Sequence, residues 1–577
     1  MRGLDYWVLL GYLAGLLVVG GIFTKIKDSA EMFAAGRRAP WWVSGLSGFM
    51  TIFTAGTFVV WGGIAYRLGL VSVSILGVTS VSMIVVGFCL AGRWREMGLT
   101  TPAEFLELRF GKATLQLYVW LGTVCRSLGM AVALYALSVM LVALIPLPEG
   151  NVLRDSRTGN LSATWAILIC GIAVVGYTVA GGLWAVLMSE VIQCIVLCLS
   201  VAIAVPLCLM RVGGFGNLVA RAPAGFFAPV AGEFGGWFLF FWAVLGFFRY
   251  GADWAFVQRY ICVPTVRDAR RVAYLMGGLY VVAPFLWMLP AMAYRVLNNR
   301  ADPEQAYILI CREVLPEGML GMMMAAMFSA TASTVSSLLN VFAGVFTRDV
   351  YRPLIRPEAT ERHLVKVGRI VTLGYGALII GGALTVPYMG GAEQLVLTLT
   401  TLLLGPLMLP VVWGVFSRRI NHRAIWVTLA VSGVAGALTK AGFTRNGRTA
   451  PWGEGAMAVF SRWAQENNRL LEGIVGFVVP FTLLLIMELL ARHRQTDSGW
   501  LRLREAVLRQ RAETPAVGKA STLPARIVAW TLGVLGAVMA VIALIAPGDQ
   551  RVILFLFSAL LASSAGGVVW VCHKRCT

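Results

Sequence analysis

Charged residues are scarce in this 577-residue chain: it holds 28 Asp and Glu in total, and only four His. A soluble globular domain carries about 25% charged residues, whereas here Asp, Glu, Lys and Arg together make up 13% and hydrophobic residues make up 58%. This composition excludes a soluble globular protein. It predicts an all-α, polytopic membrane protein in contact with the lipid bilayer.

Recognisable catalytic and metal-binding patterns are also missing. The four histidines stand far apart, and the ten cysteines are scattered without a C-x-x-C pair. The chain has no G-x-x-x-x-G-K-[ST] loop and no G-x-S-x-G elbow. We therefore expect no enzyme, no ATP hydrolysis and no metal site beyond sodium.

The positive charges are distributed as in a membrane protein. About fifteen apolar runs reach the length of roughly 18 residues that a spanning helix needs, and every second loop between them is rich in Lys and Arg. The net charge of +20 therefore indicates cytoplasmic loops and not nucleic-acid binding. This pattern predicts an inner (plasma) membrane protein with its N-terminus outside and its C-terminus in the cytoplasm, and a basic cytoplasmic loop at about 491–525.

One apolar run, residues 50–70, has the composition of an interrupted helix. It contains Thr51, Thr54 and Thr57 at intervals of three residues, together with four glycines. Irregular backbone is tolerated at membrane depth only where it is buried or lines a cavity, and such breaks mark transporter binding sites. If the run is helical, the three threonines share one face. The alternative is that their hydroxyl groups only bond back to the preceding turn.

Residues 328–340, FSATASTVSSLLN, carry a second group of intramembrane hydroxyl groups. Ala330, Ser333 and Thr334 lie at i, i+3 and i+4 and therefore on one helix face. Two hydroxyl groups and a carbonyl group beside a broken helix suit a hard cation such as Na⁺. The alternative is that these small residues only allow close helix packing.

Charged residues inside apolar runs form the third polar feature. Arg126 and Arg249 need an anionic partner or a polar cavity. Glu190 and Asp253 are candidate structural partners for them, and the alternative is that these carboxylates lie near the inner interface and extend to it. For Asp253 we favour the structural role.

Five motifs together resemble the sodium/solute symporter family, which includes sodium-coupled sugar, proline, pantothenate and sialic-acid carriers. The resemblance runs in order from about residue 4 to residue 440. The motifs are GRRAPWWVSGLSGFMT (36–51), GLTTPAEFLELRFG (98–111), AGGLWAVLMSEVIQ (180–193), GADWAFVQRYICVPTVRDARR (251–271) and SSLLNVFAGVFTRDVYRP (336–353).

The resemblance implies a LeuT-like fold of two inverted repeats of five helices, with extra helices at both ends. On this basis residues 1–40 form an extra N-terminal helix and a cytoplasmic loop, and residues 41–420 form the transport core. The repeats cover about 42–211 and 234–417, and residues 421–577 are accessory. The first helix of each repeat is broken in this family, so we expect Gly246 and Gly251 to mark the break in the second repeat.

The resemblance also implies the ion site. The family's principal sodium site corresponds here to the carbonyl groups of Met50 and Phe53 and to three residues of a later helix, which are Ala330, Ser333 and Thr334. Glu190 matches the position of a possible second sodium, which the missing hydroxyl group at Ala330 disfavours.

For the solute, the resemblance favours an organic anion such as a sialic acid or another sugar acid. Thr54, Thr57 and Arg126 match substrate positions of the sialic-acid branch, and Arg249 stands where sugar carriers have a polar pocket residue. Arginine suits a carboxylate because its planar fork can donate two hydrogen bonds. A neutral sugar or amino acid is the alternative solute, and a transporter-derived sensor is a more distant one. We expect sodium and a small solute as partners, and a functional monomer.

Overall fold

The computed structural model describes residues 3–22, 37–51, 53–99, 101–177, 183–439, 459, 463–464, 467–491, 496–513, 523–546 and 548–576. These residues form helices joined by turns, with three isolated β-bridges and no strand among them. The predicted all-α fold class is therefore confirmed. Lys25 and Lys27, most of residues 440–469 and parts of the predicted basic loop at 491–525 lie outside the described residues.

Ten helices of the described chain are long and apolar enough to cross a membrane, and three shorter apolar helices accompany them. The first set of core helices comprises α3 (Trp41–Met50) with α4 (Gly62–Leu68), α5 (Leu70–Val86) with α6 (Gly92–Glu96), α8 (Lys112–Leu144), α9 (Ala163–Tyr177) and α10 (Leu183–Val212). The second set comprises α12 (Gly236–Ala252) with α13 (Trp254–Ile261), α14 (Val266–Leu297), α16 (Met319–Val345), α17 (Glu361–Thr385), and α18 (Gly391–Thr398) with α19 (Gly405–Phe416).

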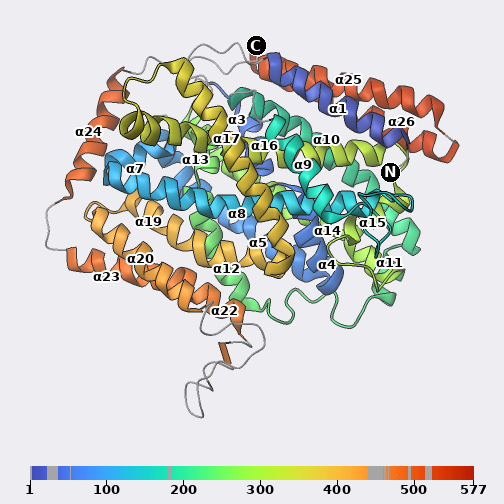
Figure 1. Cartoon of the computed structure of the whole chain (residues 1–577), viewed down its shortest axis with the longest axis horizontal. Coiled ribbons are helices and arrows are strands. Elements are labelled where there is room, and N and C mark those ends of the chain that lie inside the picture. Colours follow the sequence, from blue (N-terminus) through green and yellow to red (C-terminus); the bar gives the residue numbers. More distant parts are fainter. Residues whose placement is uncertain are drawn as a thin grey trace.

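The remaining helices connect or flank these two sets. They are α1 (Gly3–Ile22), α7 (Pro102–Phe110), α11 (Phe215–Arg221), α15 (Ala306–Val314), α20 (His422–Leu438), α22 (Asn468–Gly473), α23 (Val479–Leu490), α24 (Ser498–Glu513), α25 (Leu523–Ile545) and α26 (Gly548–Cys576). Figure 1 shows α1, α25 and α26 together along one edge and α24 across one end of the bundle.

The core helices pack into two groups. In one group α14 packs against α5, α3, α4 and α10, and in the other α8 packs against α17, α9 and α16. Helices α10 and α16 also contact each other and so connect the groups. A bundle of this kind can accommodate a solute path between two groups that move relative to each other.

Helix interruption in the first set is confirmed. α3 ends at Met50, and Thr51, Phe53 and Thr54 do not continue the helix. A π-helical segment, η3 (Thr57–Trp61), then leads into α4. π-Helical turns often accompany functional sites because they free backbone groups from the regular ladder.

The predicted break at Gly246 and Gly251 is wrong. α12 runs continuously through both glycines to Ala252, and the backbone leaves the helix at Asp253, where φ is −63° and ψ is 130°. The glycines serve close packing instead. A Cβ at Gly246 would lie 2.7 Å from the Ser82 hydroxyl oxygen, and one at Gly251 would lie 2.5 Å from Leu90.

The accessory helix α1 is fixed to the core by a buried carboxylate. Asp5 is 2% exposed and accepts hydrogen bonds from the backbone N–H groups of Gly318 (2.7 Å) and Gly321 (3.0 Å) at the start of α16. An anionic side chain stabilises the first turn of a helix, where N–H groups lack partners inside the helix. The extra N-terminal helix therefore caps the helix that carries Ser333 and Thr334.

Candidate functional site

The break in the first core helix lies against α16. The backbone N–H of Ala55 donates to the hydroxyl oxygen of Thr331 (3.1 Å), and Thr331 donates to the carbonyl oxygen of Met327 (3.0 Å). Thr331 belongs to the FSATAST run but is not one of the predicted ligands. The Thr331 hydroxyl oxygen thus satisfies an N–H group at the break and joins the break to the helix that carries Ala330, Ser333 and Thr334.

The predicted sodium ligands are buried and rich in oxygen. Met50, Phe53, Ala330 and Ser333 are between 1% and 4% exposed. The Thr334 hydroxyl group donates to the Ala330 carbonyl oxygen (2.9 Å), which leaves the lone pairs of the hydroxyl oxygen available to a cation. The Met50 carbonyl oxygen accepts from the N–H of Phe53 (2.8 Å) in a tight turn at the break. This donor set suits sodium, which favours neutral oxygen ligands.

The three threonines do not form the single face that a continuous helix would give. Thr51 donates to the carbonyl oxygen of Ser47 (2.9 Å), as the alternative interpretation predicted for it. The Thr57 hydroxyl oxygen accepts from the N–H of Thr54 (3.3 Å), and the Thr54 hydroxyl oxygen accepts from the N–H of Gly56 (3.2 Å). The hydroxyl groups of Thr54 and Thr57 thus stabilise the irregular backbone, because the break removes its usual hydrogen bonds.

Aromatic rings also pack against the residues around the break. Trp287 of α14 packs against Phe53 with ring centroids 4.7 Å apart and against Phe49 at 5.2 Å. Phe58 stacks on Tyr307 at 4.1 Å. The sequence offered no local signal for these contacts, since the partners lie in distant helices.

Glu190 pairs with Arg259 of α13, an arginine of the motif 251–271. The Arg259 guanidinium donates to the Glu190 carboxylate (2.8 Å), and these side chains are 5% and 7% exposed. Ser47 also donates to Glu190, and Arg259 Nε donates to the Ser47 hydroxyl oxygen (3.1 Å). The expectation that Glu190 partners Arg126 or Arg249 is therefore wrong, and Glu190 instead joins α3, α10 and α13.

Arg126 lies at the break in the second set of helices. It is roughly 21 Å along α8 from the first residue of that 33-residue helix. Its Nη2 is 3.5 Å from the Asp253 carboxylate, and the side chains are 18% and 15% exposed. The guanidinium also lies 5.4 Å from the centre of the Trp254 ring. The predicted structural role of Asp253 is supported twice over, because its carboxylate also accepts from the N–H of Ala255 (3.0 Å) and caps α13.

Arg249 and the threonines are not joined to Arg126. Among the described residues, no hydrogen bond or ion pair links Arg126 to Thr54, Thr57 or Arg249. Arg249 lies 5.9 Å from the centre of the Tyr250 ring, and its buried Nε has no hydrogen-bond partner in the described part of the chain. A Cβ at Gly56 would lie 3.9 Å from Ala136, which is roughly 15 Å further along α8 than Arg126.

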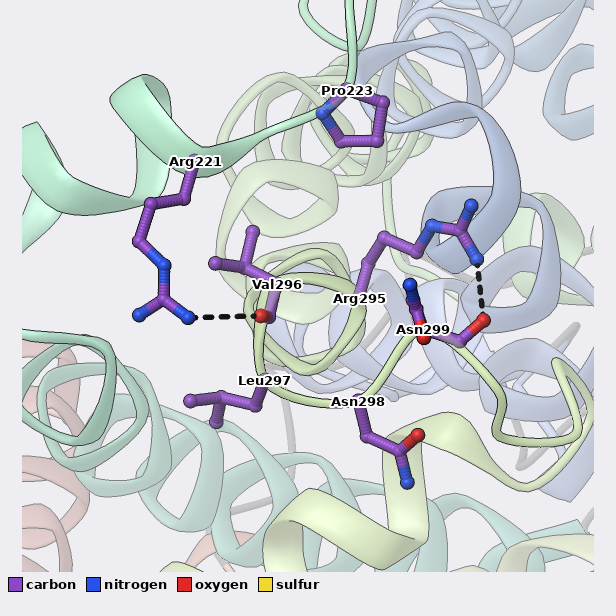
Figure 2. A pocket seen from close by; sticks show the side chains of 7 residues that line it. All are labelled: Arg221, Pro223, Arg295, Val296, Leu297, Asn298 and Asn299. Carbon is purple, nitrogen blue, oxygen red and sulfur yellow. Dashed lines mark hydrogen bonds between the residues drawn. The ribbon is translucent and has the colours of Figure 1, made fainter.

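A cavity of about 360 Å³ lies away from these residues, at the end of α14. Figure 2 shows its two arginines pointing to opposite sides of the segment 296–299. Arg221 approaches the carbonyl oxygen of Val296 (3.5 Å), and Arg295 donates to that of Asn299 (3.0 Å). Because the guanidinium groups diverge and face backbone carbonyls, they satisfy the end of a helix and do not enclose one ligand.

Comparison with known proteins identifies the family. A model of the sodium:solute symporter family matches residues 32–228 and 239–430, more than half of the chain. The sodium/glucose cotransporter of Vibrio parahaemolyticus is 27% identical over 436 residues, covering 68% of this chain and 76% of that protein. The sodium/sialic acid symporter NanT of Aliivibrio fischeri is 25% identical over 457 residues, covering 74% of this chain and 86% of that protein.

A solved structure shares the fold. The chain of a substrate-bound, outward-open, Na⁺-coupled sialic acid symporter superposes with a TM-score of 0.66 at 22% identity, covering 85% of this chain and 98% of that one. The architecture is accordingly the predicted LeuT-like arrangement of two five-helix repeats with extra helices at both ends. The chain is an integral membrane protein that belongs to the sodium:solute symporter family.

Proposed function

We propose that this protein imports a small organic anion, such as a sialic acid or another sugar acid, together with sodium. Membership of the family supports sodium-coupled solute import as such. The observation that carries the choice of an anion is Arg126, a guanidinium near the middle of a membrane-spanning helix and beside the break at Asp253. Intramembrane charges usually mark substrate or ion paths.

The geometry around Arg126 leaves it able to bind a carboxylate. The guanidinium has five N–H donors, and its distance of 3.5 Å from Asp253 is long for a charged hydrogen bond. If Arg126 turned to a ligand, Asp253 would still accept from the N–H of Ala255. The exchange would therefore not leave a bare carboxylate. Two relatives named as sodium/sialic acid symporters, 25% and 26% identical, support the same solute class.

In the proposed cycle one sodium ion binds between the break in the first repeat and α16. Its ligands are the carbonyl groups of Met50 and Phe53 together with Ala330, Ser333 and Thr334. Sodium would replace hydrogen bonds that the break has removed and so order the residues that include Thr54 and Thr57. Movement of the group around α14 against the group around α8 would then open the site to the cytoplasm. The transport core is assigned to residues 41–420, with accessory segments at 1–40 and 421–577.

The contacts of Glu190 favour one transported sodium ion over two. Its carboxylate already accepts hydrogen bonds from Arg259 and Ser47 in a buried cluster. A second cation at Glu190 would therefore have to displace the charged Arg259 side chain. One sodium ion moved with one monoanion transfers no net charge. The membrane potential, worth roughly 2.3 kcal/mol per charge at 100 mV, then contributes no free energy to solute uptake. The sodium concentration gradient supplies that free energy.

A neutral solute is the second candidate. It is favoured by the ion pair between Arg126 and Asp253, which neutralises the arginine without a ligand, and by similarity to a sodium/glucose cotransporter. In that case Arg126 would be a structural partner of Asp253.

A thermal-shift screen of the purified protein against carboxylates, sugars and amino acids, with and without Na⁺, separates the candidates. We expect a carboxylate to stabilise the protein only in sodium. Arg126→Lys keeps the charge but loses the fork, so carboxylate affinity should fall by about 1–3 kcal/mol.

The amide of the same solute serves as the control ligand. It should bind wild type weakly, and its deficit relative to the carboxylate should shrink in Arg126→Ala. Equal binding of acid and amide by the wild type would contradict the anion proposal and favour the neutral solute.

A further inference from the structure

Gln193 is a fully buried side chain of α10 with one unsatisfied polar atom. The residue is 0% exposed, and its Nε2 donates to the hydroxyl oxygen of Ser329 on α16 (2.6 Å). Its amide oxygen, Oε1, is also buried and has no hydrogen-bond partner in the described part of the chain. Buried acceptors are nearly always paired, so this oxygen calls for a ligand.

Contacts of α16 place Gln193 level with the break in the first repeat. Ser329 contacts Gln193, and Thr331, two residues later, accepts from the N–H of Ala55. Ala330, whose carbonyl is an expected sodium ligand, lies between them. The unpaired amide and the break therefore meet α16 at the same level from different sides, with Ala330 between their two contact residues.

Contacts of α3 lead to the same level. Ser47 of α3 contacts Glu190 of α10. The two helices run in the same direction, because the chain that follows each of them reaches the same end of α14. After α3, Tyr66 donates to the Asn298 carbonyl oxygen, and after α10, Arg221 approaches the Val296 carbonyl oxygen. Three residues beyond Ser47 on α3 is Met50, where that helix ends, and three residues beyond Glu190 on α10 is Gln193. Each step is roughly 4.5 Å along its helix, so Gln193 lies level with the end of α3.

We propose that the amide oxygen of Gln193 is an additional ligand of the transported sodium ion. This inference rests on the proposed sodium site between Met50, Phe53 and α16. A neutral amide oxygen is a good ligand for a hard cation. In the structure Nε2 of this amide donates to Ser329, and the oxygen is the end left free for a ligand.

The test uses sodium itself as the ligand and needs no knowledge of the solute. Thermal stabilisation of the purified full-length protein is measured against Na⁺ concentration, with K⁺ replacing Na⁺ at constant ionic strength. Gln193→Met keeps the length of the side chain but removes the oxygen, and it should raise the half-saturating Na⁺ concentration about tenfold, as expected for a lost hydrogen bond or ligand to a charge. Gln193→Glu keeps an oxygen and should stay within about threefold of wild type.

Ser200→Ala is the matched control. Ser200 is also on α10 and 0% exposed, and its hydroxyl oxygen likewise has no hydrogen-bond partner among the described residues, but it lies roughly 10 Å further along the helix. Its removal should leave the half-saturating Na⁺ concentration unchanged.

The outcomes separate this inference from the proposed sodium site. If Ser333→Ala weakens sodium binding and Gln193→Met does not, the site stands and the amide oxygen is not a ligand. If Gln193→Met weakens it and Ser333→Ala does not, the amide oxygen is a ligand and the α16 assignment fails. A wild type that Na⁺ stabilises no more than K⁺ does would overturn both.

Discussion

The hydroxyl groups of Ser333 and Thr334 are the single-residue features on which sodium coupling is expected to depend. Both belong to one face of α16. Ser333 is 4% exposed, and Thr334 already donates to Ala330. Their oxygen atoms are therefore fixed by the helix before an ion arrives, which lowers the cost of ordering the site.

Ser333→Ala with Thr334→Ala is predicted to raise the Na⁺ concentration for half-maximal uptake by more than Ser333→Ala does alone. Each substitution removes a ligand but little volume, so the melting temperature in K⁺ should stay close to that of wild type. Uptake in proteoliposomes at varied Na⁺ measures the effect. Unchanged sodium activation in the double variant would show that the ion binds elsewhere.

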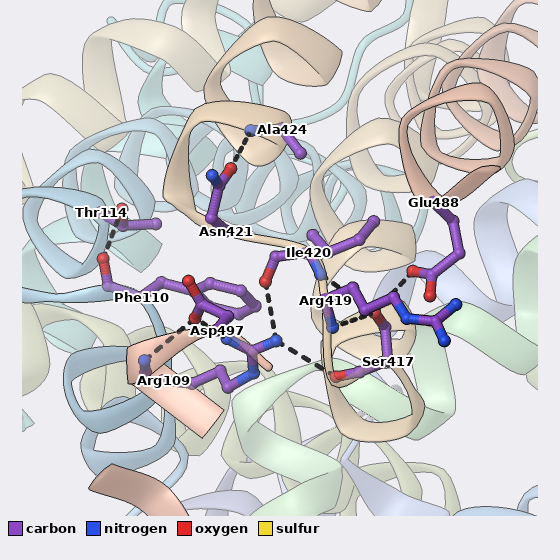
Figure 3. Close-up of polar contacts among 11 residues, drawn as sticks. Arg109, Phe110, Thr114, Ser417, Arg419, Ile420, Asn421, Ala424, Glu488 and Asp497 are labelled. Atoms are coloured by element: carbon purple, nitrogen blue, oxygen red, sulfur yellow. Dashed lines mark hydrogen bonds and ion pairs between the residues drawn. The ribbon is translucent and has the colours of Figure 1, made fainter. Parts of the chain in front are cut away.

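Helix α24 provides the clearest case at the scale of an element. Figure 3 shows Arg109 of α7 held by the segment before α24 and by the turn between α19 and α20. Its side chain is 0% exposed and donates to Asp497 (2.6 Å), to the Ser417 carbonyl (3.1 Å) and to the Ile420 carbonyl (2.7 Å). Burial lowers the pKa of Arg109, and Asp497 opposes that shift. The basic loop predicted at 491–525 thus begins with a helix fixed to the core.

Asp497→Ala is predicted to release α24 from α7, because a buried guanidinium left without its carboxylate costs about 3–5 kcal/mol. Gly499→Ala should have the same effect, since a Cβ there would lie 1.9 Å from the Arg109 carbonyl oxygen. Hydrogen exchange of the backbone amides of α24 measures the release.

The control for this prediction is Glu107→Gln. Glu107 lies on the same helix, α7, in an exposed pair with Lys112 at 4.0 Å. Protection of α24 should not change in this variant. Full protection in Asp497→Ala would mean that apolar packing alone holds the helix.

The start of α18 depends on the carboxylate of Glu304. It accepts from Tyr135 (2.9 Å) and from the N–H of Ala392 (3.1 Å). Burial raises the pKa of Glu304, and the two hydrogen bonds oppose that shift. On α18, Glu393 follows Ala392 directly and pairs with Arg67 of α4 at 2.6 Å. Two carboxylates therefore fasten the N-terminal end of α18.

Glu304 is predicted to make stability depend on pH. The folded state holds the proton more tightly than the unfolded chain, so the contribution to stability is complete below pH 4.5, the ordinary pKa, and is lost as pH rises through the raised pKa. In Glu304→Gln this loss disappears. The melting temperature of the variant relative to wild type should therefore increase from pH 4.5 to pH 8, whereas Glu149→Gln, whose side chain is 93% exposed, should show no such trend.

Over the whole molecule, the alternation of basic loops predicts the orientation in the membrane. Arginine-rich α24 and the cluster around Arg267, Arg270 and Arg271 would face the cytoplasm, and the N-terminus of α1 would face outward. A fluorescent protein fused to the C-terminus should therefore fluoresce, and an N-terminal epitope should be accessible in intact cells. The opposite labelling pattern would reverse the assignment.

Several features could be predicted from local sequence. Hydropathy determines that the chain spans the membrane, because twenty apolar residues are stable only there. Threonine and glycine within the run 50–70 indicated the interrupted helix, because these residues locally weaken the backbone hydrogen bonding of an α-helix. The hydroxyl groups of α16 were likewise visible from their spacing.

Only the tertiary structure decided which groups meet. Arg259 and not Arg126 neutralises Glu190, and the partners are 69 residues apart. Gly246 and Gly251 looked like a break but allow close packing, because what a glycine does depends on the helix beside it. Gln193 stood inside a recognised motif, yet its unpaired oxygen became evident only when α10, α16 and the break were placed together. Such pairings are long-range, and no periodicity in the sequence records them.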